Sequence, residues 1–448
     1  MPNHNRSNDL SRRGFLRFGA GTAAALGLTG VRGLALPTTQ GADYKALVCV
    51  FLYGGADSFN LIVPTSASEY AAYLTSRGDL AETQASLLPI STLDGGPVTW
   101  GLHSAVPELQ SLFQSGRLAF VGNVGPLVGP TTKGGIAANA DPLPVSLFSH
   151  NDQQATWQRA IADAPGSTGW AGRMLDVLGP VNGNTVLPPG ISVDQQNVLQ
   201  VGASASPYVI GTEGLLPLAD TDDETRKALF KTFGAAQQQP LGQALAKTQS
   251  EAIDIYDVLS SQLAGAPSFD GQFPLTGLGQ QLRTVARLIA IRSQLGMSRQ
   301  VFFVSAGGYD THEGQTQQLP GLYAALSQAI GAFQQALGQL GEGPNVTTFT
   351  HSEFGRTLSS NGKGSDHGWG GHAFVVGDSV QGQRIYGTMP DLSIDGPDDL
   401  GEGRLIPTTS VSQYANTLAR WFGLDPAAAN TVFPNLARFA TPTLGFLG

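Results

Sequence analysis

Five nearly continuous apolar runs constrain most strongly what this chain can fold into. They occupy residues 45–53, 117–124, 300–306, 345–350 and 373–377. Runs without polar alternation are typical of parallel strands that are buried on both faces of a sheet. Segments with apolar residues at i, i+3 and i+4 lie among them, at 104–115, 149–162, 241–263, 278–295 and 321–340. Strands alternating with helices predict an α/β fold, with a mostly parallel sheet covered by helices on both faces.

Composition excludes a disordered or low-complexity chain. Of the 448 residues, 58 are Gly and 27 are Pro, which together stay below the roughly 25–30% that marks low complexity. Hydrophobic residues make up 41% and charged residues only 13%, which favours a packed core under a sparsely charged surface. The single cysteine, Cys49, lies in the first apolar run. It excludes an internal disulfide and any CxxC motif, and we expect a buried thiol.

The charge balance argues against nucleic acid and anionic membranes as partners. The formal net charge is −9, and it becomes −13 without residues 1–35, which contain five Arg and one Asp. An acidic body repels phosphate backbones and anionic lipid surfaces. An exported redox enzyme has little support either, because the sequence contains neither a GxGxxG fingerprint nor a CxxCH haem motif.

Residues 1–35 carry the pattern of a twin-arginine export signal. Arg12 and Arg13 stand in the sequence SRRGFL, a weakly apolar Gly/Ala-rich run follows, and Arg32 comes late. The apolar run is too short and too rich in glycine for a stable membrane span of about 20 residues. We therefore expect the twin-arginine translocase as partner during export, and a periplasmic or extracellular mature protein. This route carries folded proteins, which favours a metal or cofactor loaded beforehand.

The remaining chain predicts one domain rather than two. Residues 42–448 contain no convincing linker and no repeat of fixed period. Residues 180–240 are poorly periodic, with short strand-like pieces, and we expect them to form a small insertion against the sheet.

Polar residues follow three of the apolar runs at points where ligands bind in open α/β sheets, beyond the carboxyl ends of the strands. Asp57 lies in GGADS after the first run, where it either contributes a carboxylate to a site or caps a turn. Asp310 and His312 lie in SAGGYDTHEGQ after the run at 300–306. Being two apart, they share a face of an extended backbone and can converge on one cation. Oxygen and imidazole suit zinc, manganese or iron, whereas a polar loop capped by Asp310 is the structural alternative.

A third polar region follows the run at 345–350. Asp366, His367 and His372 lie in SDHGWGGH, where three glycines give the loop the freedom to bring them to one site. The alternative is a solvated glycine loop with incidental histidines. Glu353 either adds a carboxylate to the site or holds one of the metal ligands in place without contacting the metal. Arg356 either neutralises an oxyanion or forms an ordinary ion pair.

The chain resembles the secreted family called "domain of unknown function 1501" over nearly the whole mature sequence. The resemblance depends on the twin-Arg start and on the motifs GGADS, GLHSAVPEL, SHNDQQATWQ, GWAGR, TVARLIA, FFVSAGGYDTHEGQ, SEFGRTLSSNG, SDHGWGGHAFVVG and SVSQYANTLARWFG. This family is grouped with the alkaline phosphatase-like superfamily, which includes sulfatases. The resemblance therefore implies an alkaline phosphatase-like fold and a metal-dependent hydrolase.

The resemblance also implies roles for particular residues. Asp57 would be an early ligand of one or two divalent metal ions, with zinc, manganese, iron and calcium all open. The later ligands would be Asp310, His312, Asp366, His367 and His372. The commoner family pattern is Gly-Gly-Asn-Asp-Gly, so Ala56 and Ser58 depart from it beside an intact Asp57.

The nucleophile is the open part of this assignment. Ser149 begins the SHNDQQATWQ segment, where free N–H groups at a helix N-terminus favour an anion, but a plain N-cap serine fits equally well. Ser58 is the second candidate. His150 is a ligand, a base or polar packing.

Two functions follow from these residues and from the resemblance. The first is an exported metal-dependent hydrolase of phosphate or sulfate esters, on a small-molecule or polymer substrate. Ser149 or activated water would attack, and Arg356 would stabilise the developing charge. The second is a catalytically degenerate metal-binding or surface-assembly protein with the same fold.

Overall fold

The computed structural model describes residues 43–183, 185–212, 215 and 223–448. Residues Asp43–Gly448 form one compact unit. The expected signal at 1–35 lies outside the described residues. None of the described helices is both long and apolar enough to cross a membrane.

A central sheet of nine strands, counted over the described residues, organises this unit. The strand order is β13-β5-β12-β9-β1-β8-β6-β7, and β14 also pairs with β5. Their bounds are β1 Lys45–Leu52, β5 Leu118–Gly125, β6 Gly190–Ser192, β7 Tyr208–Val209, β8 Arg299–Ala306, β9 Val346–Ser352, β12 Gly371–Val376, β13 Arg384–Tyr386 and β14 Thr409–Ser410. All pairings are parallel except those of β12, which runs antiparallel to β5 and β9.

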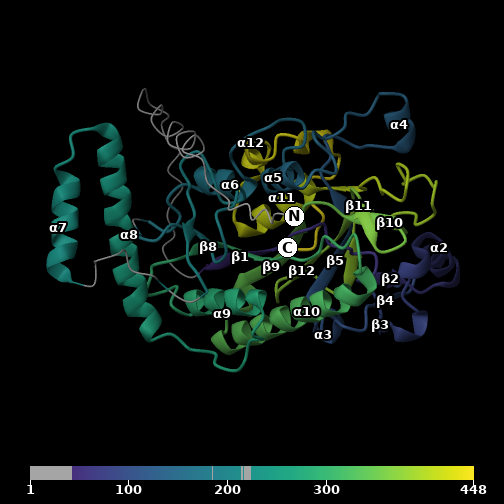
Figure 1. Ribbon diagram of the computed structural model, residues 1–448, viewed down its shortest axis with the longest axis horizontal. Coiled ribbons are helices and arrows are strands. Elements are labelled where there is room, and N and C mark those ends of the chain that lie inside the picture. The colour runs from purple at the N-terminus through teal and green to yellow at the C-terminus, as the bar shows by residue number, and fades with distance from the viewer. Residues whose placement is uncertain (1–42, 184, 213–214, 216–222) are drawn as a thin grey trace, which may run out of the picture. The chain divides into compact units, whose positions relative to one another are not determined.

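Helices cover both faces of this sheet (Figure 1). One face packs against α3 Pro107–Gln114, α9 Gly277–Ala290, α10 Gln315–Leu340 and part of α8 Pro240–Ala264. The other packs against α5 His150–Arg159, α6 Trp170–Leu178, α11 Val411–Phe422 and α12 Ala429–Val432. Strand β1 shows why: its side chains alternate between the two apolar clusters, with Val48 in the first and Cys49 in the second. The predicted α/β class, mostly parallel and covered on both faces, is confirmed.

Smaller elements surround this framework. They are α2 Ala67–Arg77, α4 Lys133–Ala137, α7 Glu224–Ala235, a three-stranded sheet of β2 Ile62–Pro64, β3 Leu88–Ile90 and β4 Trp100–Leu102, and a hairpin of β10 Arg356–Ser360 and β11 Ser365–His367. Short 3-10 turns occupy Gly78–Leu80, Gln84–Ser86, Gly343–Asn345, Pro426–Ala428 and Leu436–Arg438.

The segment expected as an insertion at 180–240 contributes directly to the sheet. It contains β6 and β7, which extend the sheet in parallel beyond β8. It also contains α7, which packs along α8 through the ion pairs Lys227–Asp257 and Lys231–Asp254. In Figure 1 these two helices extend away from the sheet.

Candidate metal centre

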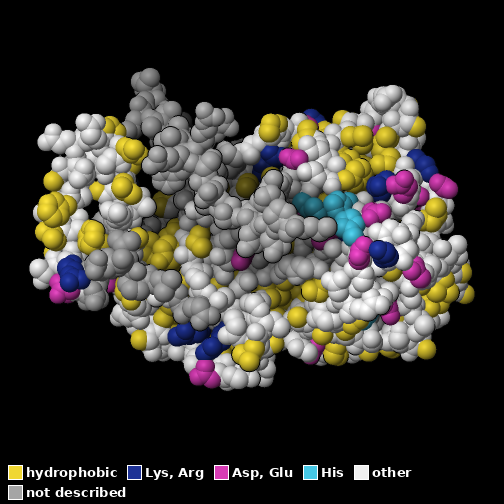
Figure 2. All heavy atoms as spheres, viewed as in Figure 1, with side chains coloured by type: hydrophobic (Ala, Val, Ile, Leu, Met, Phe, Trp, Pro, Cys, Tyr) yellow, Lys and Arg dark blue, Asp and Glu magenta, His cyan; other side chains and the backbone are white. Residues whose placement is uncertain are grey.

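Several sequence-predicted site residues meet beyond the carboxyl ends of β1, β8 and β9. Asp310 and His312 follow β8, Glu353 follows β9, and Asp366 and His367 lie on β11. The hairpin β10–β11 brings the last two to the ends of the central strands, which a regular strand could not do. Figure 2 shows the result as a patch of histidine side chains at the surface, with acidic side chains beside it.

Three imidazoles converge on the carboxylate of Asp310. His312 Nε2 lies 3.1 Å and His367 Nε2 lies 3.4 Å from Asp310 Oδ1. His150 Nε2 lies 3.4 Å from the other oxygen, Oδ2. The Nε2 atoms of His312 and His367 are themselves only 2.9 Å apart. Ligand atoms of His150, Asp310 and His367 all lie within 4.8 Å of one another, as a metal site requires.

The opposite nitrogen of each imidazole faces an oxygen that accepts hydrogen bonds. His150 Nδ1 lies 3.0 Å from Glu353 Oε1, and His312 Nδ1 lies 2.9 Å from Asp366 Oδ1. His367 Nδ1 lies 2.8 Å from the carbonyl oxygen of Phe148. Ionised carboxylates and carbonyls cannot donate, so each Nδ1 carries the proton and donates it. In a neutral imidazole Nε2 then carries no proton, and its lone pair is directed toward Asp310.

This arrangement lacks positive charge at its centre. Converging lone pairs and carboxylate oxygens repel one another unless a proton or a metal ion lies among them. Among the described residues this hydrogen-bonded group contains three carboxylates, those of Asp310, Glu353 and Asp366, and one guanidinium, that of Arg356, which bonds to Asp310. A divalent cation would balance the remaining two negative charges. Imidazoles whose Nδ1 donates to a carboxylate or carbonyl are the usual environment of metal-bound histidine.

The electrostatic shifts follow from these contacts. Burial alone would raise the pKa of Asp310, but the hydrogen bond and charge of Arg356 outweigh it, and the pKa is lowered. The pKa of His367 is lowered as well, first by burial and further by the charge of Arg356, although the hydrogen bond to the carbonyl oxygen of Phe148 raises it. The pKa of Asp366 is lowered chiefly by the hydrogen bond from Asn361. All three shifts favour the forms that bind cations.

Two glycines allow the strands to approach this closely. A Cβ at Gly54, where φ is +119°, would lie 2.3 Å from the backbone nitrogen of Asp310. A Cβ at Gly55, where φ is +78°, would lie 2.2 Å from the ring of Phe354. That ring packs against His150 and His367, with centroids 5.0 and 4.5 Å away. The GGADS motif therefore makes room for the cluster rather than supplying its ligands.

The structure places Asp57 apart from the imidazoles. Its side chain is fully buried and forms an ion pair with Arg77 of α2. Gln315 donates to Oδ2 at 2.5 Å, and the backbone N–H of Phe59 donates to Oδ1 at 2.9 Å. Both carboxylate oxygens thus have partners within the chain, which leaves no imbalance for a cation to correct.

His372 and Ser58 also lie outside the cluster. The Nδ1 of His372 accepts from the backbone of Asn123 at 3.1 Å, and its own backbone N–H donates to Ser58 Oγ at 2.7 Å. Burial lowers the pKa of His372 to about 3, so this imidazole stays neutral. Ser58 is 4% exposed and holds the start of β12.

The other two candidates for catalysis are engaged locally. Ser149 precedes α5, and its hydroxyl donates to Asp152 at 2.9 Å. Arg356 is fully buried and donates to Asp310, to the carbonyl of Gly54 and to Ser365. It positions Asp310, and these bonds use four of its five N–H groups. Among the described residues no serine or threonine hydroxyl is hydrogen-bonded to Asp310 or to the three imidazoles.

Sequence reasoning misses the partners that decide these roles. Arg77 of α2 neutralises Asp57 and Gln315 of α10 donates a hydrogen bond to it, and no spacing rule connects either residue with GGADS. The sequence places His150 next to Ser149 at the start of a predicted helix, which leaves it open between ligand, base and packing. Its adjacency to Asp310 depends on how α5 docks, which the local sequence does not encode.

The chain belongs to the family described as "Protein of unknown function (DUF1501)", which matches residues 44–433. No curated protein matches it. Solved structures that resemble it include a 2-O GAG sulfatase, at 10% identity and a TM-score of 0.32, covering 88% of this chain and 75% of the other. The lipoteichoic acid synthase LtaP from Listeria monocytogenes has 8% identity and a TM-score of 0.32, with 85% and 72% covered. An alkaline phosphatase from the Antarctic bacterium TAB5 has 8% identity and a TM-score of 0.27, with 77% and 95% covered.

Proposed function

We propose that His150, His312, His367 and Asp310 bind a divalent transition-metal ion, and that the protein is an exported metal-dependent hydrolase of phosphate or sulfate esters. The observation that carries the proposal is the convergence of three Nε2 lone pairs on one carboxylate, each imidazole fixed by an acceptor behind its Nδ1. Imidazole ligands favour zinc, iron or manganese over calcium, which takes oxygen ligands.

The chain's own residues prepare this site in three ways. Arg356 holds one oxygen of Asp310 by a 2.8 Å hydrogen bond and keeps the carboxylate ionised. Glu353, fully buried, accepts from the backbone of Gly54 as well as from His150, and so fixes the ring of His150 against the end of β1. Such fixed orientation of ligands is worth a large part of the affinity of a metal site.

The site is open to a substrate on one side. The side chain of Asp310 is 45% exposed, that of His312 39% and that of Asp366 50%. A bound divalent cation would act as a Lewis acid that polarises a phosphoryl or sulfuryl oxygen. Phe354 excludes water from the inner side of His150 and His367 by packing on both rings. A neutral imidazole is also able to accept a proton when it is not a ligand.

The second function, a catalytically degenerate metal-binding or surface-assembly protein, is favoured by one observation. The hydroxyls of Ser149 and Ser58 have other partners and do not contact the cluster. A chain that uses a serine nucleophile would be expected to direct one at the metal ligands. The metal and the ester turnover therefore have to be measured separately.

Elemental analysis of the protein purified without chelator or added metal tests the site. We expect about one equivalent of a transition metal in the parent and in Asp270→Ala, a control at an exposed aspartate that pairs with Arg283. Asp310→Ala and His367→Ala should lose it. Turnover of 4-nitrophenyl phosphate and 4-nitrophenyl sulfate then tests the hydrolase. Metal without turnover would favour the second function, and a folded, metal-free parent would overturn both.

Export by the twin-arginine translocase to the periplasm or the exterior is part of the proposal. It is supported by Arg12 and Arg13, by the acidic net charge of the remaining chain and by the candidate metal site. Changing both to Lys should leave the protein in the cytoplasm of its host, detectable by fractionation. Secretion of that variant at the parental level would contradict it.

A further inference from the structure

Phe148 lies in a backbone conformation that bulky residues rarely adopt. Its φ is +71°, in the left-handed region that favours glycine. Such residues persist only where their neighbours hold them in place, and they are concentrated at functional sites. The conformation alone does not identify a site, because Phe269, which packs against Phe273, has a φ of +52°. The contacts of Phe148 therefore decide its role.

The carbonyl group of Phe148 contacts a candidate metal ligand. Its oxygen lies 2.8 Å from His367 Nδ1. A carbonyl oxygen can only accept, so it fixes the proton of a neutral imidazole on Nδ1 and leaves Nε2 free for a cation. Carboxylate side chains do the same for His150 and His312. Of the three imidazoles, only that of His367 depends on a backbone group, whose direction is set by the conformation of the chain at Phe148.

Phe148 also ends the turn that leads into α5, two residues before His150. Gln153 of α5 is 1% exposed, and its Nε2 donates to the carbonyl oxygens of Val145 and Ser146, both at 3.0 Å. The turn is thus tied to the helix that carries His150. A change in the backbone of Phe148 would therefore disturb two candidate ligands.

Arg404 holds the ring of Phe148 in this position. Its guanidinium lies 5.1 Å from the ring centre, within the range of a cation–π contact, and its Nε donates to the carbonyl oxygen of His367 at 3.2 Å. Together with the hydrogen bond from His367 to Phe148, these contacts close a triangle of three residues. A tight loop presents Arg404: at the preceding Gly403 φ is +76°, and a Cβ would lie 2.7 Å from the backbone nitrogen of Ser359.

We propose that Phe148 is a positioning residue of the metal centre. Its left-handed backbone, held by Arg404 on the ring, directs the carbonyl at His367 and keeps that imidazole in the Nδ1–H form, which can bind a cation through Nε2. The role in metal binding rests on the proposed metal site, whereas the Nδ1–H form exists without metal. The two can therefore be tested separately.

Glycine and alanine at position 148 distinguish this role from simple packing. If the ring only filled space, glycine would be the more harmful replacement, because it removes more of the side chain. If the backbone conformation is what matters, glycine should be the less harmful one, because it adopts a positive φ without a steric cost. The expected order of the two variants is thus opposite for the two roles.

Zinc affinity, measured by competition with a chromophoric chelator, is the first test. Phe148→Ala should raise the zinc dissociation constant about tenfold or more, the lower end of the effect of residues that orient metal ligands. Phe148→Gly should raise it by less than about threefold, and Phe148→Tyr should match the parent. Arg404→Met leaves the ring without its cation and should resemble Phe148→Ala.

The second test reads the imidazole of His367 directly and needs no metal. NMR of metal-free protein that carries isotope-labelled histidine reports which ring nitrogen bears the proton, and the signal that disappears in His367→Asn assigns the residue. We expect the Nδ1–H form in the parent and in Phe148→Gly. In Phe148→Ala and Arg404→Met the population should shift toward the Nε2–H form.

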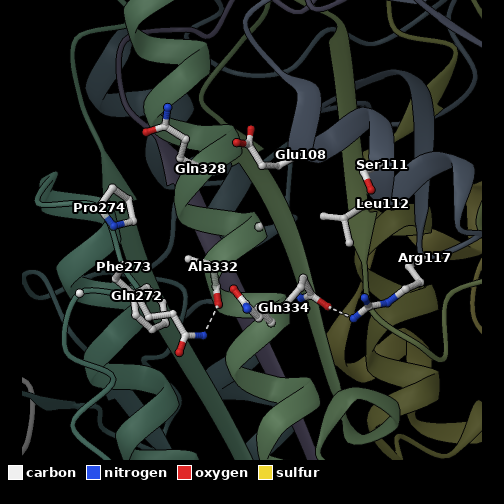
Figure 3. Close-up of a pocket in the computed structure, with 13 residues that line it drawn as sticks. Glu108, Ser111, Leu112, Arg117, Gln272, Phe273, Pro274, Gln328, Ala332 and Gln334 are labelled. Atoms are coloured by element: carbon white, nitrogen blue, oxygen red, sulfur yellow. Dashed lines mark hydrogen bonds between the residues drawn. The ribbon is translucent and has the colours of Figure 1, made fainter.

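Two matched variants serve as controls and should leave both readouts unchanged. Phe269→Ala replaces the other phenylalanine with a positive φ named above. Arg117→Met replaces an arginine that is 31% exposed, close to the 29% of Arg404. Figure 3 shows Arg117 beside α10, where it donates to Gln334 at the edge of a groove whose lining residues do not include any of the metal centre.

Two results would overturn the proposal. One is an effect of Phe148→Gly on zinc affinity as large as that of Phe148→Ala, and the other is the same protonated nitrogen of His367 in all variants. A parent that binds no zinc would overturn the proposed metal site alone, because the NMR measurement would still decide whether Phe148 positions His367.

Discussion

Asp57 and Asp310 follow neighbouring strands at the same edge of the sheet, yet their carboxylates lie in opposite situations. Asp57 is fully buried, and an arginine, an amide and a backbone N–H occupy its two oxygens. Asp310 is 45% exposed, and besides Arg356 it faces the Nε2 atoms of three imidazoles. The first carboxylate is complete within the chain, whereas the second leaves room for a proton or an added cation.

This difference shows what identifies a metal ligand. An acidic residue after a strand is an insufficient signal, because both aspartates satisfy it. The informative feature is the balance of donors, acceptors and charge once all neighbours are counted. In that balance Arg77 does for Asp57 what a metal ion would do for Asp310.

Removing Arg77 should therefore produce the largest loss of stability in this comparison. Arg77→Met leaves the Asp57 carboxylate buried without its counter-charge, which costs about 3–5 kcal/mol of unfolding free energy. Urea unfolding of the metal-free protein measures it. The double variant Arg77→Met/Asp57→Asn removes both charges and should recover a large part of the loss. A single variant as stable as the parent would mean that Asp57 carries no charge in the folded protein.

The matched change at Asp310 should have little effect on stability. Asp310→Asn in metal-free protein should change the unfolding free energy by less than about 1 kcal/mol, because the side chain is half-exposed and its amide oxygen can still accept from Arg356. Added zinc should raise the melting temperature of the parent and not of this variant. Equal stabilisation by zinc in both would place the metal elsewhere.

The residues behind the ligands allow the comparison to be sharpened. Glu353→Gln keeps the shape of a fully buried side chain but replaces the carboxylate that accepts from His150. We expect the zinc dissociation constant to rise about 10–100-fold, measured by competition with a chromophoric chelator. Glu313→Gln, at an exposed glutamate paired with Lys363, is the control and should leave the affinity unchanged.

The sequence predicts those features that depend on local patterns, and it does not predict those that depend on how distant elements pack. The apolar runs predicted β1, β5, β8, β9 and β12, because a strand buried on both faces is apolar over most of its length. Asp310 and Glu353 could be grouped because they follow the parallel strands β8 and β9, whose carboxyl ends meet at the same edge of the sheet. The neutralising role of Arg77 could not be predicted, since it depends on how α2 packs across the sheet edge. The same holds for His150 on α5.

His351 extends the comparison to a group that burial alone keeps neutral. It is 1% exposed, neither ring nitrogen has a partner among the described residues, and it lies among aromatic rings, those of Trp157 and Phe349 being 5.1 and 5.2 Å away. Burial lowers its pKa to about 3. The unfolded chain takes up this proton near its ordinary pKa of about 6.5, so the stability that His351 contributes is present above that pH and lost as the pH falls.

At pH 5 the loss from His351 should be about 2 kcal/mol relative to pH 8. His351→Phe retains an aromatic ring and cannot titrate, so its unfolding free energy should fall less between these two pH values. Urea unfolding of metal-free parent and variant at both pH values measures the difference. Identical pH dependence would show that the imidazole takes up a proton in the folded state or does not contribute to acid sensitivity.

Ser149 provides the smallest expected effect and the sharpest test of the catalytic assignment. Its hydroxyl donates to the carboxylate of Asp152 and makes no capping bond to the backbone of α5. Ser149→Ala should therefore cost less than about 1 kcal/mol of stability and leave metal content unchanged. If the hydrolase uses no serine nucleophile, ester turnover should also stay within a factor of two. A variant that keeps its metal and its stability but loses turnover by about a hundredfold or more would instead make Ser149 the nucleophile. The hydroxyl would then have to leave Asp152 and reach the imidazole cluster when substrate binds.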